Sequence, residues 1–219
     1  MMRVDQAPEP LGFKDAIHKK GMAWLRRNPN KDPSSYYWER AKLPNGLTCR
    51  EALHKGYHGI CAYSMIRIFD GQSYHVDHFH PKGVARYRKE AYNWGNYRLA
   101  GSAWNQRKNA RDVQDPFTVP IGACVLRLAD GEISYDKKIS GWENCQKTIE
   151  ALGLNEGATR ESRKDAYEDY KSLDMGVKRL ARDYPFVAYE MLRQNQLKAE
   201  DRQPCVDKLH ELGFSWVRG

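Results

Sequence analysis

The sequence contains few cysteines, and no two of them form a C-x-x-C pair. Five cysteines are spread over 219 residues, at Cys49, Cys61, Cys124, Cys145 and Cys205. An odd and scattered set argues against a disulfide framework and indicates a reducing compartment. A chain of this length can bury a stable core without disulfides.

Long apolar runs are also missing. No run approaches the roughly 18 residues that a membrane-spanning helix needs. The first residues, MMRVDQAPEPLGF, lack the apolar stretch of a secretory signal. We therefore expect a globular protein that works in the cytoplasm and not at a membrane.

Acidic residues are outnumbered by basic ones. The chain has 36 Lys and Arg against 28 Asp and Glu, which gives a formal net charge of +8. Such a surplus suggests an anionic partner, and nucleic acid is the most economical choice. Because many basic proteins bind no nucleic acid, the surplus gains weight only beside a matching site.

Apolar spacing and turn signals predict an α+β protein without clear linkers. Thr48 and Glu51 have the spacing of a capping box, which marks the start of a helix. The elements expected in the first two thirds are a helix at 13–27, a helix at 49–55, a hairpin within 60–79 split at Asp70-Gly71, a strand at 96–100, a helix at 103–111 and a hairpin at 123–135.

The last third is expected to be helical. Apolar residues from Ala166 onward predict a helix that runs until Pro185 stops it, and a final helix covers 204–212. The chain then divides into an N-terminal helical segment at 1–57, a central unit at 58–116, and a hairpin followed by helices at 117–219.

The stretch SYHVDHFHPKG, residues 73–83, contains three of the seven histidines. Within it, Asp77 can bind a hard divalent cation through oxygen, and a neutral His78 can take a proton from water. A strand would place the two on opposite faces, so a distortion near Pro81 is expected to bring both to one site. Together they suit metal-assisted hydrolysis of a phosphodiester.

A second group of polar residues follows in NQRKNAR, residues 105–111. The amide oxygen of Asn105 is a hard ligand that can complete the metal site. Lys108 lies one turn further along the same helical face. We expect Lys108, together with Arg107 and Lys82, to bind the phosphates of a nucleic acid.

The segments VDHFHPKG and NYRLAGSAWNQRKNAR together resemble HNH endonucleases. This resemblance implies a ββα-metal unit inside a mostly helical single domain. It implies that His78 is the general base and that Asp77 and Asn105 bind Mg²⁺ or Mn²⁺. Asn96 would orient the His78 ring or brace the loop. His80, where relatives often have arginine, would contact phosphate or sit beside the metal.

The order of the flanking segments is similar to that in one bacterial subgroup. These segments are MRVDQAPEPLGF, CREALHKGYHGICAYSMIRI, DHFHPKG and TIEALGLNEGATRESRKDA. The subgroup is the PtuB-like HNH subunit of Septu-type and retron-associated anti-phage defence systems. It implies a toxic effector that cleaves DNA or tRNA. Its implied partners are an ABC-like, PtuA-like ATPase and, in retrons, a reverse transcriptase with its RNA–DNA hybrid.

The sequence departs from that pattern at the structural zinc site. Relatives carry two C-x-x-C pairs, whereas this chain has Cys61 and Ser64 at the first and Gly101 and Trp104 at the second. One thiolate of four remains, and neither serine nor tryptophan is a good zinc ligand. We therefore expect no structural zinc, with apolar packing that includes Trp104 in its place.

Two other interpretations remain open. A non-catalytic subunit for nucleic-acid binding or assembly could retain the HNH shell, and the loss of zinc thiolates favours it. A zinc hydrolase could use His75, His78 and His80, although that spacing is awkward on a strand. In the nuclease interpretation His75 is expected to be partly buried and hydrogen-bonded.

Overall fold

The computed structural model describes residues 1–36, 38–69 and 71–219. The chain mixes helices and strands, as the α+β expectation requires. The α-helices are α1 (Lys19–Arg27), α2 (Cys49–Gly56), α3 (Ser102–Lys108), α4 (Trp142–Leu152), α5 (Gly157–Lys171), α6 (Val177–Asp183), α7 (Pro185–Arg193) and α8 (Ala199–Glu211). The strands are β1 (Tyr74–His78), β2 (Tyr97–Gly101), β3 (Cys124–Arg127) and β4 (Glu132–Tyr135).

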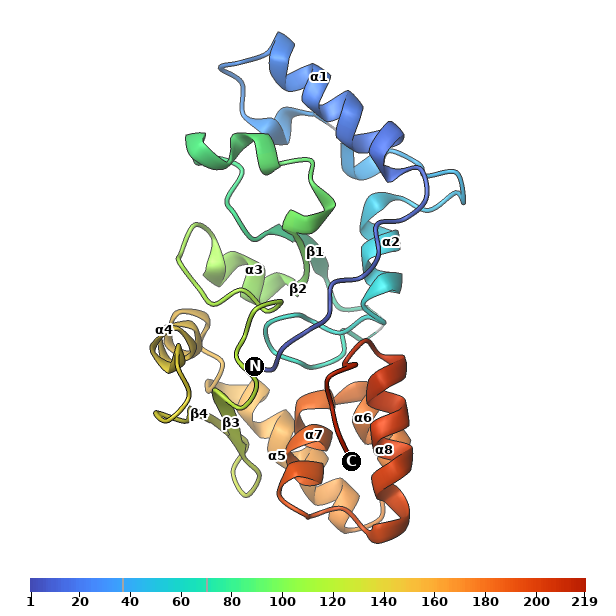
Figure 1. Ribbon diagram of the computed structural model, residues 1–219, viewed down its shortest axis with the longest axis vertical. Coiled ribbons are helices and arrows are strands. Elements are labelled where there is room, and N and C mark those ends of the chain that lie inside the picture. Colours follow the sequence, from blue (N-terminus) through green and yellow to red (C-terminus); the bar gives the residue numbers. More distant parts are fainter. Residues whose placement is uncertain (37, 70) are drawn as a thin grey trace.

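The elements are spread along the long axis of the molecule (Figure 1). Helix α1 lies at one end, β1, β2 and α3 lie near the middle, and α6, α7 and α8 lie at the other end. One cluster of buried apolar side chains draws on all of these parts. Among the described residues, no helix has the length and apolar character needed to cross a membrane.

The helix expected at 13–27 is confirmed, although it opens with a π-helical turn at Lys14–His18 before α1. Its buried face includes Phe13, Ile17 and Leu25, as the spacing predicts. The expected capping box of α2 is also present. The backbone N–H of Glu51 donates to Thr48 Oγ1 at 3.2 Å, and the backbone N–H of Thr48 donates to Glu51 Oε2 at 2.7 Å.

The hairpin expected within 60–79 is wrong. Strand β1 pairs with β2, antiparallel, with Asp77 opposite Arg98 and His78 opposite Tyr97. Residues 61–69 form turns and a single bridge between Ile60 and Arg67, and Asp70 lies outside the described residues. All five residues of β2 are buried, so the pairing of β1 is decided by packing rather than by the nearest turn signal.

Helix α3 follows β2 directly and ends at Lys108, earlier than the expected residue 111. The chain leaves the helix at Asn109, which has a φ of 42°. The hairpin expected at 123–135 is confirmed as β3 and β4.

The single helix expected between Ala166 and Pro185 is also wrong. Helix α5 ends at Lys171, and Leu173 has a φ of 71° and is 68% exposed. Pro185 does not stop a helix but begins α7, because proline fits the first helical turn, where its missing N–H is not needed. Helix α8 begins at Ala199 rather than at residue 204, and ends at Glu211 before Gly213 as expected.

Helix α1 approaches Tyr92 so closely that only glycine fits at position 21. A Cβ atom on Gly21 would lie 2.3 Å from the Tyr92 ring, and that ring is buried and fixed by its hydroxyl, which donates to the Pro33 carbonyl. Overpacking costs about 1–3 kcal/mol, against a gain of about 1 kcal/mol from the better helix propensity of alanine. We therefore expect Gly21→Ala to lower the free energy of unfolding in urea.

Gly83→Ala is the control, because Gly83 is exposed, lies outside the positive-φ glycines, and has no atom beyond its chain neighbours within 4 Å of its Cβ position. That change should alter stability by less than about 0.5 kcal/mol. Equal effects of the two substitutions would contradict the close packing of α1 on Tyr92.

Candidate active site

A cleft of about 560 Å³ opens beside the end of β1. Asp77 and His78 line it from β1, Asn105 lines it from α3, and Lys82 lines it from the loop after β1. The residues Asp32 and Ser34, at the short helix Pro33–Ser35, also line it. The structure thus brings together both expected metal ligands, the expected base and one expected phosphate-binding lysine.

Asp77 is held between two donors. It is 4% exposed, and its Oδ2 accepts a hydrogen bond of 2.5 Å from the Tyr63 hydroxyl. Its Oδ1 lies 3.2 Å from the ammonium of Lys108, which is fully buried and also donates to the His78 carbonyl at 2.9 Å. Burial raises the pKa of Asp77, and the positive charge of Lys108 acts against that rise.

The His78 ring is fixed in one orientation. Its Nε2 lies 2.9 Å from the Ala91 carbonyl oxygen, and its edges meet Trp38 and Tyr97 with ring centroids 5.6 and 5.1 Å away. Because a carbonyl can only accept, Nε2 carries the hydrogen and Nδ1 of the neutral ring is the proton acceptor. Burial, followed by the charge of Lys82, lowers the pKa of His78 to about 3. The ring is therefore uncharged near pH 7.

Asn96 braces the loop that carries Ala91. It is buried, and its Oδ1 accepts from the His80 backbone N–H at 2.7 Å. Its Nδ2 donates to the carbonyls of His80 and Glu90, at 3.0 and 3.3 Å. Of the two roles expected for Asn96, the geometry agrees with bracing the loop. Its link to the His78 ring is indirect, because it bonds to Glu90, and the next residue, Ala91, supplies the carbonyl that meets the ring.

Three of the expected nucleic-acid ligands are engaged elsewhere. His80 binds Glu90 at 2.5 Å and stacks on Tyr87, with ring centroids 4.4 Å apart, and it does not line the cleft. Arg107 donates to the carbonyl of Leu152 and pairs with Glu156 in front of α5. Lys108 is wholly buried beneath Asp77. The burial of Lys108 disagrees with the expectation that it meets phosphate. For His80 and Arg107, whose side chains are 40% and 42% exposed, that expectation stays a prediction.

His75 is exposed, so the expectation of a partly buried, hydrogen-bonded histidine is wrong. The other two histidines point to different partners, His80 to Glu90 and His78 to Ala91. These positions disagree with a zinc site made of the three histidines. Within residues 1–36, 38–69 and 71–219, no three side chains of His, Cys, Asp or Glu gather into a metal-binding group.

The donors that do share the cleft fit a different kind of ion. Asp77 offers a carboxylate, and Asn105 is half-buried with no hydrogen bond from its amide to another described residue. Mg²⁺ and Mn²⁺ prefer such hard oxygen ligands, and Mg²⁺ keeps several of its waters. One carboxylate and one amide oxygen therefore suit a largely hydrated divalent cation.

Packing occupies the place where the sequence resemblance implies a zinc site. Cys61 and Ser64 are fully buried, and the Ser64 hydroxyl accepts from the backbone N–H of Ile66 at 3.3 Å. Trp104 packs against the core and lies over Gly101, whose Cβ position is 2.8 Å from the indole ring. The absence of a structural zinc stays a prediction.

Sequence reasoning missed Tyr63, Asp32 and Ser34. Tyr63 reaches Asp77 from a turn, 14 residues earlier in the chain, and no spacing rule points to that contact. The sequence Asp32-Pro33-Ser34 does predict a capped turn, and the backbone N–H of Ser34 donates to Asp32 Oδ1 at 2.6 Å. The position of this turn at the cleft, together with β1, follows only from tertiary packing.

Comparison of the chain with protein-family models gave no match, and comparison with curated proteins gave none either. The case for a function therefore comes from the geometry of the cleft and from the sequence pattern.

The burial of His78 makes stability depend on pH. Between about pH 6.5, the ordinary pKa of histidine, and the folded value of about 3, only the unfolded chain binds the proton. The free energy of unfolding therefore falls as the pH falls, by up to about 1.4 kcal/mol per pH unit from this group. The stability difference between wild type and His78→Ala should narrow by about 2 kcal/mol from pH 7 to pH 5.

Urea unfolding at several pH values measures this difference. His75→Ala is the control, since it removes an exposed histidine from the same strand and should give no such narrowing. A constant difference between wild type and His78→Ala over this pH range would show that the ring is not held neutral.

Proposed function

We propose that this protein is a metal-dependent endonuclease that hydrolyses phosphodiester bonds in nucleic acid. One observation carries the proposal: a neutral His78, whose Nδ1 has no hydrogen-bond partner among the described residues, lies beside Asp77 in a cleft that also holds Asn105. The basic charge of the chain and the lysine at the cleft fit a polyanionic substrate.

His78 Nδ1 takes a proton from water, and the water oxygen attacks the phosphorus in line with the leaving oxygen. The bond from phosphorus to the leaving oxygen breaks, and that oxygen takes a proton from solvent. The Ala91 carbonyl selects the tautomer in which Nδ1 can accept, and it continues to accept from Nε2–H once the ring is protonated. Lys82 binds a phosphate oxygen at the cleft wall and favours an anionic substrate. A Mg²⁺ or Mn²⁺ ion held by Asp77 and Asn105 would stabilise negative charge on the phosphate.

The sequence resemblance extends this proposal to an HNH-type nuclease. Strands β1 and β2 with helix α3 correspond in order to the ββα-metal unit that the sequence resemblance implies. That resemblance also implies products with a 3′-hydroxyl and a 5′-phosphate. It further implies action as the effector subunit of an anti-phage complex with an ATPase, on DNA or, in a retron setting, on tRNA.

One observation favours a second candidate, a non-catalytic subunit that binds nucleic acid. The ammonium of Lys108 lies 3.2 Å from Asp77 Oδ1, and a divalent cation must compete with that charge. In this case neither Mg²⁺ nor Mn²⁺ would change nucleic-acid binding, and Asp77→Ala would bind as wild type does.

We expect His78→Ala to lower the rate of cleavage by roughly 10²–10⁴-fold, the range that a general base contributes. The substrates are supercoiled plasmid, linear DNA and tRNA, each with Mg²⁺ or Mn²⁺, and the measurement is the initial rate of strand scission.

His75→Ala is the matched control on the same strand, and its rate should stay near that of wild type because its ring is exposed and does not line the cleft. Cleavage by His78→Ala at the wild-type rate would reject the mechanism. Loss of activity in both variants would mean that His78 has no special role.

A further inference from the structure

Helix α6 presents a purely basic face to solvent. Its exposed residues are Lys178, Arg179 and Arg182, and the remaining residues of the helix are buried. Like charges three or four residues apart on a helix repel one another and destabilise it. This repulsion must be offset by other groups of the protein or by a bound anion.

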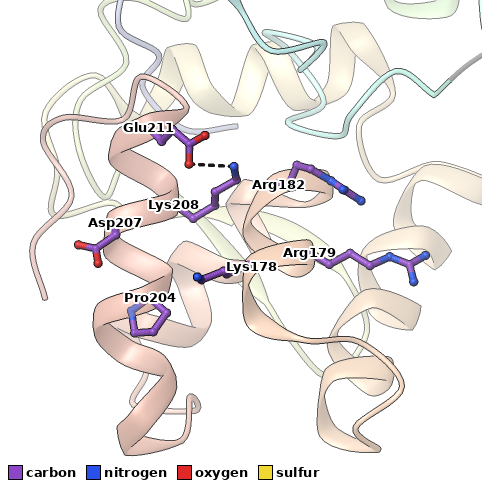
Figure 2. Close-up of a pocket in the computed structure, with 7 residues that line it drawn as sticks. All are labelled: Lys178, Arg179, Arg182, Pro204, Asp207, Lys208 and Glu211. Carbon is purple, nitrogen blue, oxygen red and sulfur yellow. Dashed lines mark hydrogen bonds and ion pairs between the residues drawn. The ribbon is translucent and has the colours of Figure 1, made fainter.

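The basic face borders a groove of about 620 Å³ between α6 and α8 (Figure 2). Lys178 extends toward α8, and Lys208 extends from α8 toward α6. Two carboxylates, Asp207 and Glu211, also line this groove, and Glu211 is paired with Lys208 at 2.9 Å. Four cationic and two anionic side chains therefore line the groove, and Arg179 and Arg182 extend from α6 on the side away from α8 (Figure 2). The cationic side chains thus outnumber the anionic ones over the groove and the exposed face of α6 taken together.

A buried carboxylate fixes the arginines in place. Asp183 is 2% exposed, and it accepts hydrogen bonds from Arg182 Nε and Nη2 at 2.7 and 2.8 Å. Nitrogen atoms of Arg179 and of Arg67 each lie 3.7 Å from the same carboxylate. One negative charge gathers three guanidinium groups and cannot neutralise them. The Arg182 guanidinium, which donates two hydrogen bonds to this carboxylate, is therefore held in one position.

We propose that this groove, formed by α6 and α8, binds the phosphodiester backbone of nucleic acid at a site separate from the catalytic cleft. Guanidinium and ammonium groups bind phosphate oxygens without reading the base sequence. The groove lies in the helical end of the molecule, whereas β1 and α3 lie near the middle (Figure 1). A long strand would then touch the protein at two places.

The identification of the ligand as the substrate rests on the proposed nuclease function, but binding at the groove can be measured without cleavage. Fluorescence anisotropy in EDTA gives the Kd for long labelled DNA and RNA at several salt concentrations. The variant is Lys178→Ala/Arg179→Ala. Arg182 is left unchanged, because it neutralises the buried Asp183.

We expect the double variant to bind roughly tenfold more weakly to DNA and to RNA, with little regard to sequence. The slope of log K against log salt should decrease in magnitude by about 1.8 for duplex DNA and about 1.4 for single strands, as the loss of two phosphate contacts requires. In a cleavage assay, KM should rise while kcat stays within about twofold.

The control is Lys55→Ala/Lys138→Ala, which removes the same charge at two exposed positions outside the groove. Its binding should stay within about twofold of wild type. Lys178→Glu serves as a second test at a single exposed position, in case the double variant has a lowered melting temperature.

Equal loss of binding in the groove and control variants would mean that net charge alone acts, and it would overturn the proposal. Unchanged binding in both groove variants would overturn it as well. If the groove variants cleave and bind as wild type does, the nuclease function stands and the proposed second binding site is wrong. If binding depends on the groove but wild type cleaves no nucleic acid, the second binding site stands and the nuclease function is wrong.

Discussion

The buried ion pair between Asp77 and Lys108 is the interaction on which the site depends. It joins β1 to the end of α3 across 31 residues of sequence, and the same ammonium also donates to the His78 carbonyl. Removing one member of such a pair typically costs about 3–5 kcal/mol, because a charge is left buried without its partner. The pair therefore fixes the distance between the strand that carries the base and the helix that carries Asn105.

A second chain of contacts sets the chemistry of His78. Asn96 ties its loop together at His80 and Glu90, and this loop brings the Ala91 carbonyl to the His78 ring. The carbonyl then selects the tautomer, and burial keeps the ring neutral. Asn96 thus acts on the cleft through the loop, whereas Asp77 lines the cleft itself and is tied to α3 through Lys108.

The sequence predicts local structure well, but it predicts poorly which polar side chains are buried and which segments pack together. The helix at 13–27 and the capping box at Thr48 depend on nearby residues, and both are present. The partner of β1 depends on the buried surface of β2, which no turn signal reveals. Likewise, spacing places Lys108 on the same side of α3 as Asn105 but cannot tell that its ammonium is buried under Asp77. The same limit explains why Tyr63 was missed.

The central claim is that Asp77 and Asn105 can hold a divalent cation beside a neutral His78. Titration with Mn²⁺, followed by nuclear magnetic resonance, tests this claim directly, since the ion broadens signals of nearby nuclei. The account predicts early broadening of the Asn105 side-chain amide and the His78 ring in wild type, and its loss in Asp77→Asn. Broadening that spares these two side chains, or that persists unchanged in Asp77→Asn, would contradict the account.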